Sequence, residues 1–151
     1  MSVRRFIAPV ALVVAVIAVL ISGWLLLRSS QEPAASAEQT DQARVRICDA
    51  FTTVHQALSI QTNVDLGSDA VAREAVAANA RLATITGGQY LMSRLDPATP
   101  SELAAPVRTF AANIEDIGMS QLVGRTNSDP HVMALMAEAQ SAGDQVAQQC
   151  A

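Results

Sequence analysis

An uncharged apolar run at residues 6–27 constrains this chain more than any other feature of its sequence. The run, FIAPVALVVAVIAVLISGWLLL, is 22 residues long. An α-helix rises 1.5 Å per residue, so the run would span about 33 Å, and the hydrocarbon core of a bilayer is about 30 Å thick. The sequence therefore predicts a transmembrane helix over residues 6–27.

The basic residues around this run predict its orientation. Arg4 and Arg5 precede it, whereas Arg28 alone follows it, with Glu32 and Glu38 beyond. Cytoplasmic flanks of membrane helices carry an excess of Lys and Arg. We therefore expect residues 1–5 to be a cytoplasmic stub and the rest of the chain to be extracytoplasmic, attached to the cell membrane by a single pass.

A cleaved signal peptide is the alternative to a signal-anchor helix. The apolar core of a signal peptide is only about 7–15 residues long. A small-residue site, Ala35-Ser36-Ala37, is present, but it lies well beyond Leu27 and Arg28. The sequence favours an uncleaved anchor and leaves open whether cleavage occurs after Ala37.

Residues 28–39 are small and polar and contain a proline, which predicts a flexible tether. From residue 29 onward seven Arg stand against 14 Asp and Glu, a net charge of −7. Binding of nucleic acids and of anionic lipid surfaces depends on basic residues. The acidic balance therefore argues against both kinds of partner.

Residues 40–151 show helical spacing of apolar residues and no convincing alternation typical of strands. Four helices are expected, over about 40–63, over about 69–95 with Ser68 as N-cap, from Thr99 to about Gly124, and from Asp129 to the end. Short loops favour an all-α, antiparallel four-helix bundle. The inner faces are expected to consist of the following residues: Val45 or Cys48, Phe51, Val54 and Leu58; Val71, Ala75, Ala78, Leu82, Ile85 and Met92; Leu103, Val107, Phe110, Ile114 and Ile117; and Val132, Met136, Ala139, Val146 and Cys150.

Three local signals refine this bundle. Thr99, Pro100 and Glu102 match a capping box with proline in the first helical position. Asp129 before Pro130 matches an N-cap. Gly87-Gly88 inside the second helix predicts either a close helix contact or a kink.

The two cysteines fit the bundle order. If the last helix runs antiparallel to the first and beside it, Cys150 lies next to Cys48. On the oxidising side of a membrane such a pair persists as a disulfide. We therefore predict a Cys48–Cys150 bond, with two free thiols or an intermolecular bond as the alternatives.

No catalytic, cofactor or metal site is expected. His55 and His131 fall roughly 18 Å apart along the predicted bundle, too far to share a metal ion. Catalytic motifs such as Gly-x-Ser-x-Gly are absent from the sequence. The most individual stretch, residues 78–95, carries possible partner-binding side chains: Asn79, Arg81, Gln89, Tyr90 and Arg94.

The plan of the chain resembles uncharacterised, Ala-rich, single-pass membrane proteins of mycobacteria and related actinobacteria. The resemblance lies in RRFIAPVALVV and WLLLR, in RICDAF around Cys48, in ANARLATITGGQYL and in the final Cys150. It implies a location in the cell envelope and no activity. The sequence thus favours a non-enzymatic envelope protein that binds a protein partner; the alternative is a small or lipid-like ligand held within the bundle.

Overall fold

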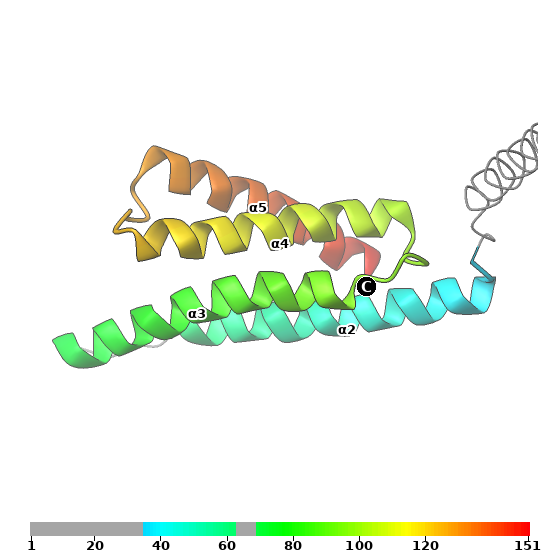
Figure 1. The fold of residues 1–151 in the computed structure, drawn as a ribbon, viewed down its shortest axis with the longest axis horizontal. Coiled ribbons are helices and arrows are strands. Elements are labelled where there is room, and N and C mark those ends of the chain that lie inside the picture. Colours follow the sequence, from blue (N-terminus) through cyan, green and yellow to red (C-terminus); the bar gives the residue numbers. More distant parts are fainter. Residues whose placement is uncertain (1–34, 63–68) are drawn as a thin grey trace, which may run out of the picture. The chain divides into compact units, whose positions relative to one another are not determined.

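The computed structural model describes residues 35–62 and 69–151, which form four α-helices and no strand (Figure 1). α2 spans Ala37–Thr62, α3 Ala70–Arg94, α4 Ser101–Leu122 and α5 Pro130–Gln149. Successive helices run in opposite directions, and each packs against the next in the chain. The predictions of an all-α fold and an antiparallel four-helix bundle are confirmed.

The predicted stub, transmembrane helix and first part of the tether, residues 1–34, lie outside the described residues. Among the helices that are described, none combines the length and the apolar character that a membrane span requires.

α2 begins earlier than predicted, so Ala37–Gln39 belong to a helix rather than to the tether. The cause is a capping box that the sequence carries as Ser36-x-x-Gln39. The Gln39 amide donates to Ser36 Oγ at 3.2 Å, and the Ser36 amide donates to Gln39 Oε1 at 2.9 Å. Both amides would otherwise lack a partner at the start of the helix.

Asp69, and not Ser68, is the N-cap of α3. The Asp69 carboxylate accepts hydrogen bonds from the amides of Val71 at 2.9 Å and Ala72 at 3.2 Å. A carboxylate at this position also interacts favourably with the helix dipole. The prediction of Ser68 as the cap is therefore wrong by one residue.

The capping box predicted at the start of α4 does not form. Pro100 is the N-cap, without a side-chain hydrogen bond. Asp96 organises the preceding turn instead, since its Oδ1 accepts from the Ala98 amide at 2.8 Å and its carbonyl accepts from the Thr99 amide at 2.9 Å. This turn buries Thr99, whose Oγ1 has no hydrogen-bond partner among the described residues.

The junction of α4 and α5 agrees with the sequence. Gly124 has a φ of +88°, and the amides of Gly124 and Arg125 donate to the carbonyls of Gln121 and Ser120. This is the Schellman arrangement that glycine favours at a helix end. Asp129 then caps α5, with the first helical position occupied by proline.

The core lies between the helices and extends over all four of them. The apolar stripe predicted for α4 is buried throughout. The residues of this core are Ile47, Ala50, Phe51, Val54, Leu91, Leu103, Val107, Phe110, Ala111, Ile114, Ile117, Val132, Leu135, Ala139, Ala142 and Val146.

The inner face predicted for α3 is wrong. Val71, Ala75, Ala78, Leu82 and Met92 are exposed. Only Gly87, Gly88 and Leu91 are buried on this helix. The helix turns its glycines inward because they allow its backbone to lie close to both neighbours.

Two distances show how close this approach is. A Cβ added at Gly87 would lie 2.9 Å from Val54 Cγ1 of α2, and one at Gly88 would lie 2.6 Å from the Ala111 carbonyl oxygen of α4. Of the two interpretations of Gly87-Gly88, the structure supports close helix contact. Smaller corrections apply elsewhere, since Val45 of α2 and Met136 of α5 are exposed.

Candidate functional site

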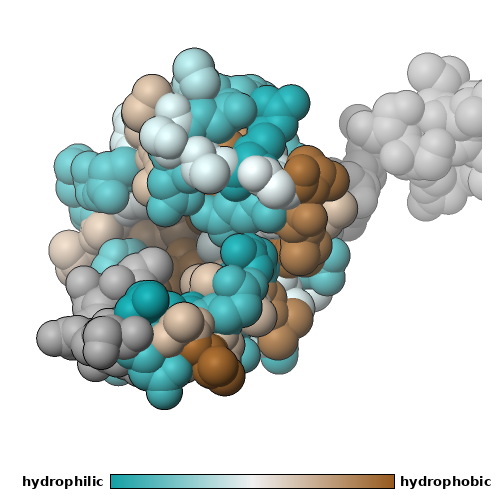
Figure 2. Space-filling model, turned by 90° about the vertical axis from the view of Figure 1, so that its left-hand side faces the viewer, coloured by the Kyte–Doolittle hydropathy of each residue, from teal (hydrophilic) through white to brown (hydrophobic). Residues whose placement is uncertain are grey.

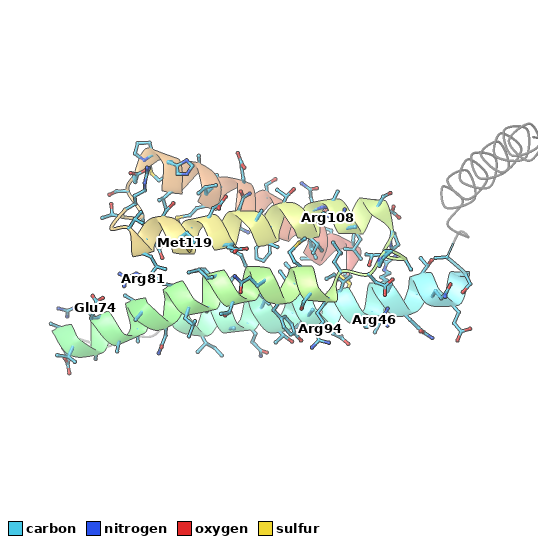
Figure 3. All side chains as sticks on the ribbon, viewed as in Figure 1. Arg46, Glu74, Arg81, Arg94, Arg108 and Met119 are labelled. Carbon is cyan, nitrogen blue, oxygen red and sulfur yellow. A yellow bond between two sulfur atoms is a disulfide. The ribbon has the colours of Figure 1, made fainter. Side chains whose placement is uncertain are left out.

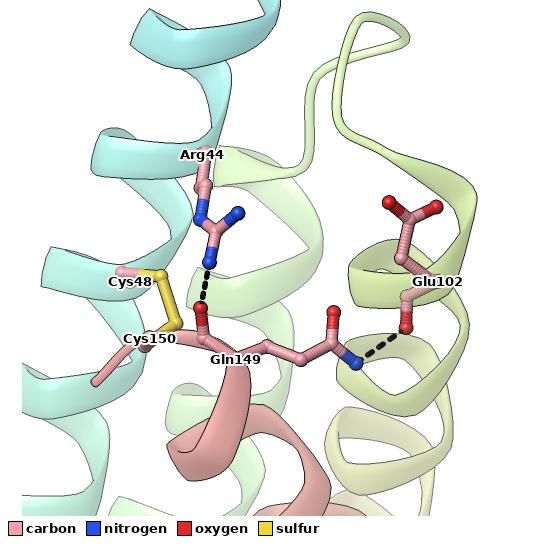
Figure 4. The surroundings of a disulfide bond; sticks show 5 residues. All are labelled: Arg44, Cys48, Glu102, Gln149 and Cys150. Atoms are coloured by element: carbon pink, nitrogen blue, oxygen red, sulfur yellow. Dashed lines mark hydrogen bonds between the residues drawn. A yellow bond between two sulfur atoms is a disulfide. The ribbon is translucent and has the colours of Figure 1, made fainter.

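The two cysteines join α2 to the end of α5 (Figure 4). The Sγ atoms of Cys48 and Cys150 lie at disulfide distance, with their Cα atoms 5.5 Å apart. An Arg44 guanidinium nitrogen donates to the Gln149 carbonyl, and Gln149 Nε2 donates to the Glu102 carbonyl at 2.9 Å. The predicted pairing is confirmed, and we call this end of the bundle the clasp.

Beyond the clasp α5 does not pack along α2, in contrast to the predicted bundle. The two helices contact each other only slightly, whereas α2 packs on α3 and α5 on α4. Figure 1 shows α5 diverging from α2 with distance from the C-terminus. The bundle is therefore closed at one end and open at the other.

The separation of α2 from α5 leaves a cleft of about 750 Å³, which is within the range of small-molecule sites. Figure 2 views the end of the bundle opposite the clasp and shows a recess with apolar residues at its base. The apolar residues that line the cleft are Phe51, Leu58, Ala77, Ala80, Phe110, Ile117, Met136, Ala139 and Ala147. Its polar and glycine lining consists of Thr52, His55, Ser59, Arg81, Thr84, Gln121, Gly124, Arg125, Thr126, Asn127, Gln140, Gly143 and Asp144.

Two aromatic rings form the inner wall of the cleft. The rings of Phe51 and Phe110 pack edge to face with centroids 5.3 Å apart. A Cβ added at Gly143 of α5 would lie 3.3 Å from the Phe110 ring and 3.9 Å from the Phe51 ring. The absence of a side chain at Gly143 thus lets α5 pack directly on both rings, each of which is only 6% exposed.

Two arginines line the opposite, outer part of the cleft. Arg81 lies on the side of α3 that faces the end of α4, as Figure 3 shows, and pairs with Glu74 at 3.2 Å. Arg125 follows the end of α4 and pairs with Asp129 at 3.5 Å. Such exposed ion pairs contribute little to stability, so both guanidinium groups can exchange partners at low cost.

The pKa of the Asp129 carboxyl lies below its ordinary value. The main cause is the hydrogen bond from the His131 amide, and the nearby Arg125 charge contributes a smaller lowering. Asp129 is therefore ionised at neutral pH and fixes the start of α5 beside the cleft.

The five residues proposed as a partner-binding set do not converge on one groove. Arg81 lines the cleft. Gln89 Nε2 donates to Glu115 of α4 at 3.3 Å. The other three face elsewhere: Tyr90 is exposed and stacks with the Arg94 guanidinium at 4.9 Å, and it lines a shallow hollow between α2 and α3 together with Asn79.

Of the cleft residues of α3, only Arg81 was among the predicted binding residues; Ala77, Ala80 and Thr84 were missed because the apolar stripe was assigned to another face. The missed signal is Ala77, Ala80, Arg81 and Thr84, which recur at helical spacing of three and four.

No group of three or more His, Cys, Asp or Glu side chains within residues 35–62 and 69–151 is arranged to hold a metal ion. No protein-family model matches the chain, and no curated protein or solved structure is significantly similar to it. The geometry of the cleft is therefore the main guide to function.

Proposed function

We propose that this chain is a membrane-anchored, extracytoplasmic helical-bundle protein of the cell envelope that binds a small or lipid-like ligand between α2 and α5. In this proposal residues 6–27 are the anchor and the protein is not an enzyme. The cleft is the observation that carries the proposal, because it is large and has apolar side chains at its base.

The composition of the lining supports an apolar ligand. Drug-sized and lipid-like ligands bind in pockets with predominantly apolar walls and a few polar groups. Phe51 and Phe110 present a small part of their rings to the cleft, since each is 6% exposed, and the alanines of α3 leave room beside them. Without a ligand, the apolar side chains of the cleft would remain in contact with water, whereas folding normally buries such apolar surface.

The extracytoplasmic location is supported by the clasp. A disulfide between Cys48 and Cys150 persists in an oxidising compartment and is rare in the cytosol. The same location follows from the charges around residues 6–27, and the two arguments are independent.

The test uses the full chain in lipid nanodiscs and a dodecanol that carries a photoreactive diazirine at its chain end. We expect labelling of peptides that contain Phe51, Phe110 or Ala139. Ala80→Trp should suppress it, because Ala80 is partly buried and lines the cleft. Ala78→Trp is the matched control, since Ala78 is exposed on α3 and about 200° away around the helix.

Equal labelling of both variants would contradict a cleft-binding function. So would labelling of the wild-type chain that is confined to residues outside the cleft. Both outcomes require that the two variants fold like the wild-type chain. Far-ultraviolet circular dichroism checks this.

A protein partner is the second candidate, and the outer face of α3 favours it. Val71, Leu82 and Tyr90 are large apolar side chains that remain exposed within about 100° of one another around this helix. Exposed apolar surface of this kind marks interaction sites in many proteins.

A photo-crosslinking amino acid at Tyr90 tests the second candidate in intact cells. The control position is Ser141, which is exposed on α5. A discrete adduct from position 90 and none from position 141 is the expected result. No adduct, or the same adducts from both positions, would count against a partner at this face.

A further inference from the structure

We infer that the ligand of the cleft is a single-chain amphiphile with an anionic head, whose carboxylate or phosphate binds Arg81 and Arg125 while its alkyl chain extends toward Phe51 and Phe110. This inference rests on the proposed ligand-binding function and adds the chemical class of the ligand and its direction in the cleft.

Both arginines that line the cleft lie near its open end, each paired with one carboxylate. A Cβ added at Gly118 would lie 3.2 Å from the Arg81 carbonyl, so Arg81 is level with the last turn of α4, which ends at Leu122. Arg125 follows that end directly and also lines the cleft. Both guanidinium groups thus belong to the part of the cleft that is remote from the clasp.

The inner part of the cleft disfavours an anion. Phe51 and Phe110 form its wall, and Asp144, the one acidic side chain among the lining residues, adjoins Gly143 beside these rings. Asp144 accepts a hydrogen bond from Gln140 at 2.8 Å, which holds its carboxylate on α5. An anionic head placed against these buried rings would lose its hydration, and at the exposed edge of this part of the cleft it would meet the Asp144 carboxylate, so the head belongs at the arginines.

The arginines retain the capacity to bind such a head. A guanidinium carries five N–H donors. Within the part of the chain that the structure describes, the Arg81 guanidinium donates one side-chain hydrogen bond, to the largely exposed Glu74. Arg125 likewise donates to Asp129. Bidentate guanidinium contacts with carboxylate or phosphate are strong and directional, and a head group can add to these exposed pairs or replace them.

The overall charge of the chain makes this local arrangement significant. Residues from 29 onward carry a net charge of −7. Two of their seven arginines nevertheless line one cleft, whereas other basic residues, such as Arg108 of α4, are exposed elsewhere (Figure 3). Two arginines within one cleft of an otherwise acidic chain favour an individual anionic molecule that can enter the cleft. They do not favour binding to an extended anionic surface, which the acidic residues elsewhere would repel.

The test compares diazirine-labelled dodecanoic acid with the matching dodecanol on the full chain in nanodiscs. We measure the acid-to-alcohol ratio of labelling in peptides containing Phe51, Phe110 or Ala139. Arg81→Gln and Arg125→Gln should each lower this ratio by about fivefold. Arg108→Gln removes the same charge outside the cleft and should leave the ratio unchanged.

The outcomes separate this inference from the proposed function. If acid and alcohol label the cleft equally, or if the Arg81 and Arg125 variants behave like the Arg108 variant, the anionic head is excluded and the apolar cleft function stands. If neither probe labels the cleft peptides of the wild-type chain, both proposals are overturned.

Discussion

Among changes that remove no core side chain, removal of the Cys48–Cys150 disulfide should lower the free energy of unfolding the most. We consider the double variant Cys48→Ser/Cys150→Ser. Its native contacts change little, because α5 keeps its packing on α4 and α2 keeps its packing on α3. The effect therefore arises mainly in the unfolded state, which gains conformational freedom.

The magnitude follows from the length of chain that the bond closes. The two cysteines are 102 residues apart in the sequence. Closure of a loop of this length removes unfolded-chain entropy worth about 4.7 kcal/mol at 25 °C. With a urea m-value of about 2 kcal/mol/M, the unfolding midpoint should fall by roughly 2 M.

The assay is urea unfolding of the full chain in nanodiscs, followed by far-ultraviolet circular dichroism. Wild-type protein treated with reductant is the internal control and should unfold like the double variant. A loss of stability below about 1 kcal/mol in both samples would refute the entropic argument. A large loss in the variant alone would instead point to a defect caused by the serines.

Three further predictions concern single positions. Gly88→Ala should lower the urea midpoint although alanine favours helices, because its Cβ would meet the Ala111 carbonyl oxygen at 2.6 Å; an unchanged or higher midpoint would contradict the close α3–α4 contact. Thr99→Val should leave thermal stability unchanged or raise it, since it removes a buried hydroxyl without a partner among the described residues; a clear loss would mean that the hydroxyl is hydrogen-bonded. Asp129→Asn keeps the capping acceptor and removes the charge. Because the His131 amide holds the pKa of Asp129 below its ordinary value, the ionised form contributes stability above about pH 4 that is lost as the pH falls through the folded pKa. The stability difference between wild type and Asp129→Asn should therefore be present at pH 7 and close in acid, and a difference that persists at low pH would contradict it.

Much of the fold could be predicted, because in those parts of the chain the local sequence pattern and the tertiary packing favour the same structure. The stripe of α4 from Leu103 to Ile117 is apolar and fully buried, and Asp129 before Pro130 caps α5. The pairing of Cys48 with Cys150 followed from the order of four antiparallel helices. In each case one strong pattern had no competitor nearby.

The failures occur where two patterns compete. On α3 the apolar residues Val71, Leu82 and Met92 suggested one inner face, but the glycines select another because only they allow close backbone contact. Thr99 matched a capping box, but the turn organised by Asp96 buries it. Composition alone could not resolve either competition.

The cleft could not be predicted, because it depends on an angle between helices. Nothing in the residues of α2 or α5 states that the two helices separate beyond the clasp. Small residues such as Ala80 and Gly143 are compatible with tight packing and with an open cleft alike. Their role emerges only when α5 is seen to pack on α4 without closing on α2.

The most direct test of the account is a crystal structure of the oxidised chain grown with dodecanoate. The account predicts α2 and α5 joined at Cys48–Cys150 and separated beyond it, with the alkyl chain against Phe51 and Phe110. The carboxylate should lie within hydrogen-bonding distance of Arg81 or Arg125. A structure in which α5 packs along the whole of α2 and leaves no cleft would contradict the account, as would dodecanoate bound only outside the bundle.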